Sequence, residues 1–280
     1  MIHRLKEKPT MKLTLISSLF ILVSLSSFAQ EKRSRLIIET DSGNMVVELF
    51  NETPAHRDNF ITLAKKGFYD GTSFHRVIEN FMIQGGDPNS KEGAEGAPGG
   101  GGPGYTIPAE IHPELFHQKG ALSAARKGDN VNPERESSGS QFYIVQGKKT
   151  SPTELKKFED RLNFDHKNAI SREFFSEPEN AEYVTRIKTA QEEGNQDDIK
   201  AVMEEVSPLI DARFEKQEFS YSPEQIETYS SFGGTPFLDK QYTVFGQVVE
   251  GIDVIDKLAS IKKNGESPVI PHRMTIKVVE

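Results

Sequence analysis

Residues 74–87 read Phe-His-Arg-Val-Ile-Glu-Asn-Phe-Met-Ile-Gln-Gly-Gly-Asp, and this is the most informative stretch of the 280-residue chain. A first strand-like run holds one cation, Arg76, among apolar residues. After a short break, a second run holds Phe81, Met82 and Gln84. A fixed guanidinium beside an apolar floor suits an uncharged, apolar group that bears a polar amide. A proline within a peptide is such a group.

Short apolar runs on both sides of this stretch predict a mainly β fold. Runs at 36–40 and 45–49 flank the turn sequence 41–44 and predict a hairpin. Glycines crowd the loop at 93–104, and strand character returns at 242–249 and in the closing run 272–279. Many short strands with glycine-rich turns favour an antiparallel barrel or a sandwich.

Two helices are expected within this β fold. Thr53-Pro54 predicts the start of a helix at 55–66, with threonine as the cap and proline in the first helical position. A short second helix is expected at 252–261, where apolar residues follow helical spacing.

Residues 148–232 are charged and helix-like, unlike the strands before and after them. Capping boxes begin at Ser151 and Ser222, and helix breaks are expected near Gly194 and Pro208. We therefore predict three or four helices inserted into a strand-rich fold.

Residues 1–29 have the pattern of a secretory signal peptide, for which Met11 is an alternative start. Lysines precede the apolar run 13–25, and Ser27-Phe28-Ala29 offers small residues at the positions that a signal peptidase reads. The apolar run is shorter than the ~20 residues of a bilayer span. We therefore predict cleavage after Ala29, rather than an uncleaved anchor, and an exported protein of the bacterial periplasm without stable membrane insertion.

The composition limits the partners of the mature chain. The net charge is −8, and removing a leader of net charge +3 makes it −11. An acidic chain without a basic stripe argues against nucleic acid and against anionic membrane surfaces. The chain has no cysteine, so it forms no disulfide.

Two further segments are candidates for a site, although each also has a simpler interpretation. In the strand at 140–146, Gln141, Tyr143 and Val145 share one face, while Phe142 and Ile144 share the other. This pattern by itself also fits an ordinary barrel strand. The loop at 235–242 contributes apolar residues that fit either a pocket wall or the core.

Two other patterns do not indicate a site. Gly99, Gly101 and Gly104 fit a dinucleotide-binding spacing, but no clear parallel strand precedes them and no helix follows. His112 and His117 have no partner at a metal-binding spacing, and we interpret them as loop and surface histidines. No metal and no cofactor is therefore expected.

Taken together, these segments resemble the cyclophilins, the prolyl isomerases with an eight-stranded barrel. The resemblance rests on segments in the family's order: 74–78, 81–87, 102–105, 120–125, 139–142 and 238 with 244–246. It implies a closed eight-stranded antiparallel barrel capped by the helices at 55–66 and 252–261. The barrel would consist of residues 36–147 and 233–280, interrupted by the helical insertion 148–232.

The resemblance also implies roles for individual residues. Arg76 matches the catalytic arginine, and Gln84 matches the glutamine that braces it. The substrate-binding positions are Phe81, Met82, Ala125, Arg126, Gln141, Tyr143, Phe237, Leu238 and Tyr242. At Arg126 the family uses a backbone contact, which survives a change of side chain.

Three positions depart from the family pattern. Tyr143 stands where many members have phenylalanine. Phe237 and Tyr242 stand where animal members have tryptophan and histidine, respectively. These changes keep isomerase activity as the implied function and weaken the expectation of tight cyclosporin binding.

The implied function is isomerisation of Xaa-Pro bonds in exported proteins, which assists their folding. The alternative is a chaperone or scaffold that binds proline-containing polypeptides without catalysis, and a ligand-carrying barrel is a weaker third hypothesis. The insertion enters between the Gln141 strand and the Phe237 loop, so it serves either as a lid, wall or docking surface or as a solvated decoration. The sequence indicates no oligomeric state.

Overall fold

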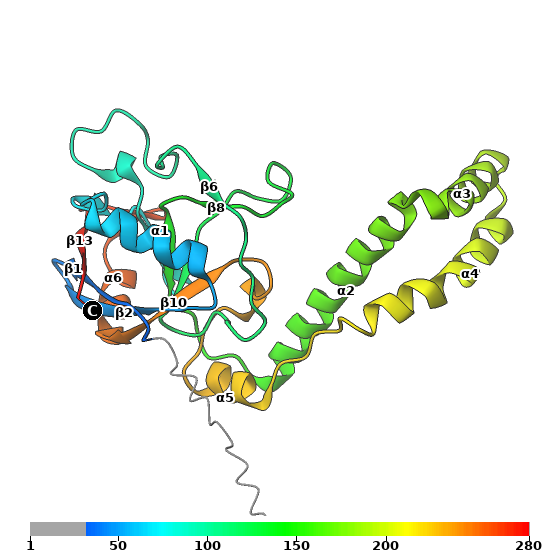
Figure 1. Ribbon diagram of the computed structural model, residues 1–280. Coiled ribbons are helices and arrows are strands. Elements are labelled where there is room, and N and C mark those ends of the chain that lie inside the picture. The colour runs from blue at the N-terminus through cyan, green and yellow to red at the C-terminus, as the bar shows by residue number, and fades with distance from the viewer. Residues whose placement is uncertain (1–31, 280) are drawn as a thin grey trace, which may run out of the picture. The chain divides into compact units, whose positions relative to one another are not determined.

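The computed structural model describes residues 32–279, so the predicted signal peptide lies outside the described residues. Its main element is a curled antiparallel sheet (Figure 1). In spatial order the strands are β3 (Thr72–Ser73), β13 (Arg273–Val278), β1 (Arg35–Thr40), β2 (Gly43–Leu49), β10 (Val244–Glu250), β7 (Ala121–Ala124), β9 (Phe142–Val145), β5 (Met82–Gly85) and β4 (Arg76–Ile78). Two small ribbons pair β6 (Thr106–Ile107) with β8 (Ser137–Ser138) and β11 (Lys263–Asn264) with β12 (Ser267–Pro268).

The prediction of a closed eight-stranded barrel is wrong, because the sheet is open. Its edge strands, β3 and β4, share no ladder among the described residues. The chain passes from one edge to the other through Phe74 and His75. The Phe74 N–H donates to His272 beside β13, whereas the His75 N–H donates to Gln84 on β5. Each residue therefore continues the ladder of its own edge, and the two strands run end to end instead of pairing.

The two faces of the sheet hold separate apolar clusters. The inner cluster includes Phe142 and Ile144, and helices α1 (Pro54–Lys65) and α6 (Ile252–Ala259) pack against the strands. The outer cluster includes Tyr143 and Val145. The predicted alternation along this strand is therefore confirmed, and its outer side chains lie on the face away from the main core.

Helix α1 begins where expected, with Thr53 at the N-cap position, but the expected capping by the Thr53 side chain is wrong. Pro54 is the first helical residue, and the hydroxyl of Thr53 makes no capping bond. The carboxylate of Glu110 accepts bonds from the N–H groups of Ala55 and His56 instead, at 3.0 Å each. A negative charge at the N-terminus of a helix also favours the helix dipole. The cap comes from a distant loop, which local sequence does not reveal.

Four α-helices occupy the segment between β9 and β10. They are α2 (Pro152–Ser176), α3 (Ala181–Glu193), α4 (Gln196–Phe214) and α5 (Pro223–Ser231), with short 3-10 turns at η1 (Pro88–Ser90), η2 (Pro178–Asn180) and η3 (Pro236–Leu238) along the chain. Both predicted capping boxes are confirmed. The predicted break at Gly194 is confirmed, and this residue ends α3 in the left-handed conformation.

The predicted break at Pro208 is wrong, because α4 continues through it. Val202, Val206 and Ile210 on α4 pack against Ile170 and Phe174 on α2. Burial of a large aliphatic side chain contributes about 1.5–3 kcal/mol. Three such side chains together offset the roughly 3 kcal/mol that proline costs inside a helix.

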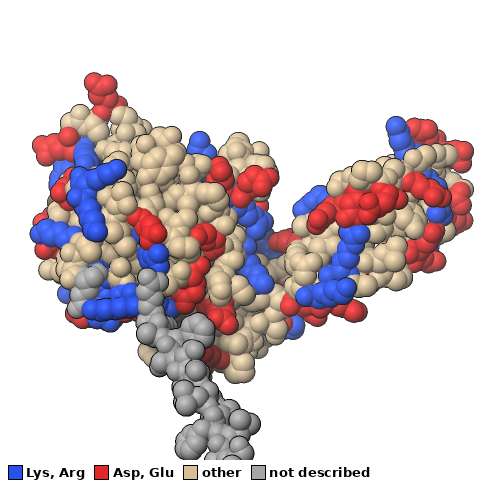
Figure 2. All heavy atoms as spheres, viewed as in Figure 1, with Lys and Arg blue, Asp and Glu red and all other residues tan. Residues whose placement is uncertain are grey.

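The surface combines both signs of charge. In Figure 2, acidic and basic side chains are interspersed over the face in view, without one broad basic area. Within residues 32–279, no helix combines the length and the apolar character needed to cross a membrane.

The inner cluster predicts a large effect for Phe142→Ala. Phe142 is 1 % exposed, and its ring lies edge-on to Phe60, Tyr69 and Phe74. Truncation of such a ring costs about 3–5 kcal/mol of unfolding free energy, measurable by urea denaturation. Phe164→Ala on α2 is the matched control, because Phe164 is 66 % exposed and should change stability by about 0.5 kcal/mol or less. Equal losses in the two variants would contradict this assignment of the core.

Candidate active site

Strand register places the central site residues in one row. Arg76 on β4 lies opposite Gln84 on β5, and Gln84 lies opposite Tyr143 on β9. The row continues to Ser123 on β7. Directly opposed residues of antiparallel strands point to the same face of a sheet. The cation, the amide and the tyrosine therefore share the outer face, although Tyr143 lies far from the other two in the sequence.

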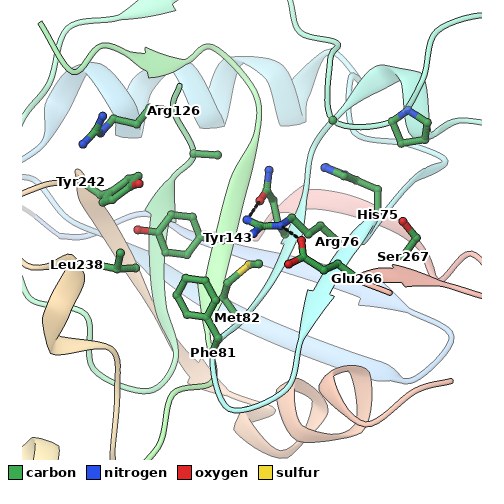
Figure 3. A pocket seen from close by; sticks show the side chains of 14 residues that line it. His75, Arg76, Phe81, Met82, Arg126, Tyr143, Leu238, Tyr242, Glu266 and Ser267 are labelled. Carbon is green, nitrogen blue, oxygen red and sulfur yellow. Dashed lines mark hydrogen bonds and ion pairs between the residues drawn. The ribbon is translucent and has the colours of Figure 1, made fainter. Parts of the chain in front are cut away.

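A hollow of about 360 Å³ lies over this row. Nine of the eleven predicted site residues line it: Arg76, Phe81, Met82, Gln84, Ala125, Arg126, Tyr143, Leu238 and Tyr242. Gln141 and Phe237 lie outside the lining. Figure 3 shows Phe81, Met82 and Tyr143 grouped together, with Arg76 on one side and Leu238 and Tyr242 on the other.

The floor of the hollow is apolar. Met82 and Tyr143 are buried in the outer cluster, and Phe81, Leu238 and Tyr242 pack against it. The rings of Tyr143 and Tyr242 meet edge to face, with centroids 5.9 Å apart. Burial raises the pKa of Tyr143 well above its usual value, so this wall stays neutral. The hollow can therefore take an uncharged, apolar ring.

Arg76 forms the polar rim of the hollow. Its Nε donates to Glu266 at 2.6 Å, and one terminal nitrogen donates to the Gln84 side chain at 3.3 Å. The side chains of Arg76 and Glu266 are 41 % and 54 % exposed. Exposed ion pairs of this kind contribute only about 0–1 kcal/mol. The bond to Gln84 therefore directs the guanidinium, while the exposed pair with Glu266 can give way to a bound group at low cost.

Gln84 is itself held from behind by Gln141. The Gln84 amide donates to the Gln141 side-chain oxygen at 3.0 Å. The Gln141 amide in turn donates to the carbonyls of Gly99 and Gly101, at 3.1 and 2.8 Å, and to Asp87 at 3.3 Å. Gln141 thus lies behind the row, where it connects the orientation of Arg76 to the glycine-rich loop.

Two further predicted site residues, Arg126 and Phe237, lie at the margin of the hollow. Arg126 folds back, donates to the Gln241 carbonyl at 2.9 Å and lies over the Tyr242 ring at 4.4 Å. Phe237 is half exposed and contacts the rings of Phe81 and Phe158 of α2. Phe237 therefore links the outside of the pocket to the helical segment.

Sequence reasoning missed several residues of the site. Glu266, Ser267, His75, Pro98 and Gly99 also line the hollow. His75 directly precedes Arg76 and was open to inference from that position, whereas the ribbon that holds Glu266 had no local signal. The interpretation of His117 as a surface residue is wrong, because its side chain is fully buried beneath Tyr143.

The described residues 32–279 contain no group of three or more metal-ligating side chains in a suitable cluster.

His75 predicts a pH dependence of stability. Its pKa is lowered from 6.5, chiefly by desolvation and against the attraction of Asp87. Below about pH 6.5 the unfolded chain therefore binds a proton that the folded site resists, so the free energy of unfolding falls as the pH falls. Urea unfolding at pH 7.5 and pH 5.0 should show a smaller loss for His75→Gln than for the unchanged protein. An identical loss in both proteins would show that His75 has no such role.

The sequence is similar to those of known proteins. The family model described as cyclophilin type peptidyl-prolyl cis-trans isomerase/CLD matches residues 35–202 and 224–280. A Staphylococcus epidermidis protein that bears the name of a peptidyl-prolyl cis-trans isomerase is 31% identical over 234 residues, covering 83% of this chain and 84% of the relative. A Staphylococcus aureus protein of the same name is 31% identical over 240 residues, covering 85% and 87% of the two chains.

The fold also has solved counterparts. A crystal structure of a cyclophilin type peptidyl-prolyl cis-trans isomerase from Cryptosporidium parvum matches with a TM-score of 0.52 and 20% sequence identity, covering 89% of this chain and 98% of that one. A second structure of that protein, determined in the presence of the dipeptide Ala-Pro, matches with a TM-score of 0.51. At this identity the structures support the fold alone. The match to the family model over most of the sequence, together with relatives that align along most of their length, shows that this chain belongs to the cyclophilin-type peptidyl-prolyl cis-trans isomerases.

Proposed function

We propose that the protein isomerises Xaa-Pro bonds in exported polypeptides and thereby assists their folding in the bacterial periplasm. The observation that supports this most strongly is the placement of Arg76 and Tyr143 on one open hollow with an apolar floor. The Cryptosporidium parvum relative was crystallised in the presence of Ala-Pro, and we propose the same class of ligand here.

The reaction requires a moderate lowering of one barrier. Amide resonance opposes rotation about the peptide bond by ~18–20 kcal/mol. Uncatalysed prolyl isomerisation takes tens to hundreds of seconds. Millisecond turnover therefore needs an acceleration of about 10⁴-fold, or roughly 5.5 kcal/mol. No covalent bond is made or broken, so the reaction needs neither a nucleophile nor a cofactor.

The proposed mechanism assigns separate tasks to the two sides of the hollow. As the bond twists, the prolyl nitrogen loses conjugation and becomes a hydrogen-bond acceptor. A donor aimed at that nitrogen stabilises the twisted state more than either planar isomer. Arg76 supplies this donor, and Gln84 orients it. Met82, Tyr143 and Leu238 hold the pyrrolidine ring while the preceding residue rotates.

Substitution of Arg76 tests the catalytic role. Arg76→Ala should lower kcat/KM for an Xaa-Pro peptide by about 10²–10³-fold, as the loss of one well-placed donor does elsewhere. Arg76→Lys keeps the charge but loses the planar fork, so it should recover only part of the rate. A protease-coupled assay measures all variants.

Arg186→Ala is the matched control, because Arg186 pairs with Glu205 on the surface of the helical segment and should leave the rate unchanged. Wild-type rates in Arg76→Ala would exclude Arg76 from the mechanism. Peptide binding without any acceleration by the unchanged protein would favour the alternative, a non-catalytic chaperone or scaffold.

The exported location has its own test. Expression of the full chain in a Gram-negative host should yield periplasmic protein whose first residue is Gln30, because Ser27 and Ala29 fit the signal peptidase positions. Cell fractionation and N-terminal sequencing measure this. An uncleaved chain retained in the cytoplasm would contradict the proposed location and leave the isomerase proposal untouched.

A further inference from the structure

A buried chain of hydrogen bonds connects the pocket wall to helix α5. The Tyr143 hydroxyl lies 2.9 Å from Nε2 of His117, and Nδ1 of His117 lies 2.8 Å from Oδ1 of Asp239. The Tyr229 hydroxyl lies 2.5 Å from Oδ2 of the same carboxylate. All four side chains are at most 5 % exposed. Polar groups so deeply buried need partners, because an unsatisfied one costs about 1–3 kcal/mol.

The chemistry of the groups sets the direction of each bond. A carboxylate can only accept, so Nδ1 of His117 carries the proton that faces Asp239. With the proton on Nδ1, Nε2 can accept, and the Tyr143 hydroxyl can donate to it. The Tyr229 hydroxyl and the His117 backbone N–H also donate to Asp239. Desolvation raises the pKa of both tyrosines well above the usual value, which keeps both as donors.

This chain of hydrogen bonds connects the pocket wall to the base of the helical segment. Tyr143 is a wall of the hollow, and Asp239 directly follows the wall residue Leu238. Tyr229 belongs to α5 and packs with Leu155 of α2 in a cluster at the base of the helical segment. The Tyr229 carbonyl also accepts from the Thr150 N–H at 3.0 Å. Loss of the Tyr229 hydroxyl would remove the donor that lies 2.5 Å from Oδ2 of Asp239 and leave the Tyr221 hydroxyl as the remaining tyrosine beside this carboxylate.

We infer that His117, Asp239 and Tyr229 are positioning residues, which fix the Tyr143 ring through its hydroxyl and make the proline pocket depend on helix α5. This inference rests on the proposed function of that pocket. It gives the base of the helical segment a definite role, because α5 supports the site from behind. It also explains the tyrosine at position 143, because a phenylalanine there has no hydroxyl that could form a hydrogen bond with His117.

A double-mutant cycle tests the inference. Tyr229→Phe should lower kcat/KM for an Xaa-Pro peptide by about fivefold, the factor that one ordinary hydrogen bond represents. In the Tyr143→Phe background the same change should alter kcat/KM by less than about 1.5-fold, because coupled residues are not additive. Asp239→Asn, also made in both backgrounds, is the second variant should Tyr229→Phe fail to fold. Equal effects in the two backgrounds, or no effect in either, would overturn the inference.

A control and a second readout separate positioning from loss of stability. Phe174→Leu weakens the core of the helical segment, which lies away from the chain of buried hydrogen bonds. This variant should lower the unfolding free energy without changing kcat/KM. The aromatic NMR signals of Tyr143 should shift in Tyr229→Phe and stay in place in Phe174→Leu. Unmoved signals in Tyr229→Phe would also overturn the inference. The NMR result does not depend on turnover and therefore tests the positioning inference by itself. If the proposed function is wrong, the protein without substitutions will show no isomerase activity.

Discussion

The register of four antiparallel strands is the constraint on which the site depends. A slip of one residue in any pair would turn a whole strand's side chains to the opposite face of the sheet. The observed register aligns Arg76, Gln84, Tyr143 and Ser123 across β4, β5, β9 and β7. The same register buries Ile83 and Ile144 in the inner cluster. The core therefore fixes which side chains face the hollow, and catalysis and stability depend on one pattern of pairing.

Two sets of hydrogen bonds hold the row from opposite sides. On one side, Gln141 connects Gln84 and thus Arg76 to the glycine-rich loop. On the other side, His117 and Asp239 connect Tyr143 to α5. The donor and the apolar wall are therefore supported independently. Such preorganisation matters because a donor fixed before the reaction costs no reorganisation when the amide twists.

Much of this arrangement could be predicted from sequence, because its signals are local. The two-residue alternation at 142–145 correctly assigned the faces of β9, and Ser151 and Ser222 correctly marked two helix starts. The failures involve groups distant in sequence. Glu110, and not the Thr53 hydroxyl, accepts the bonds at the start of α1. The partner of the buried His117 is Asp239, which lies 122 positions away in the sequence. Whether the sheet closes likewise depends on how its edge strands meet, and no local sequence pattern specifies this.

The most direct test of the account is a crystal structure of the mature protein with a bound Xaa-Pro peptide. We predict that the pyrrolidine ring lies on Met82, Tyr143 and Leu238. The Arg76 guanidinium should lie within hydrogen-bond distance of the prolyl amide, about 2.7–3.2 Å. A peptide bound elsewhere, or a proline in the hollow with Arg76 still directed only at Glu266, would contradict the central claim.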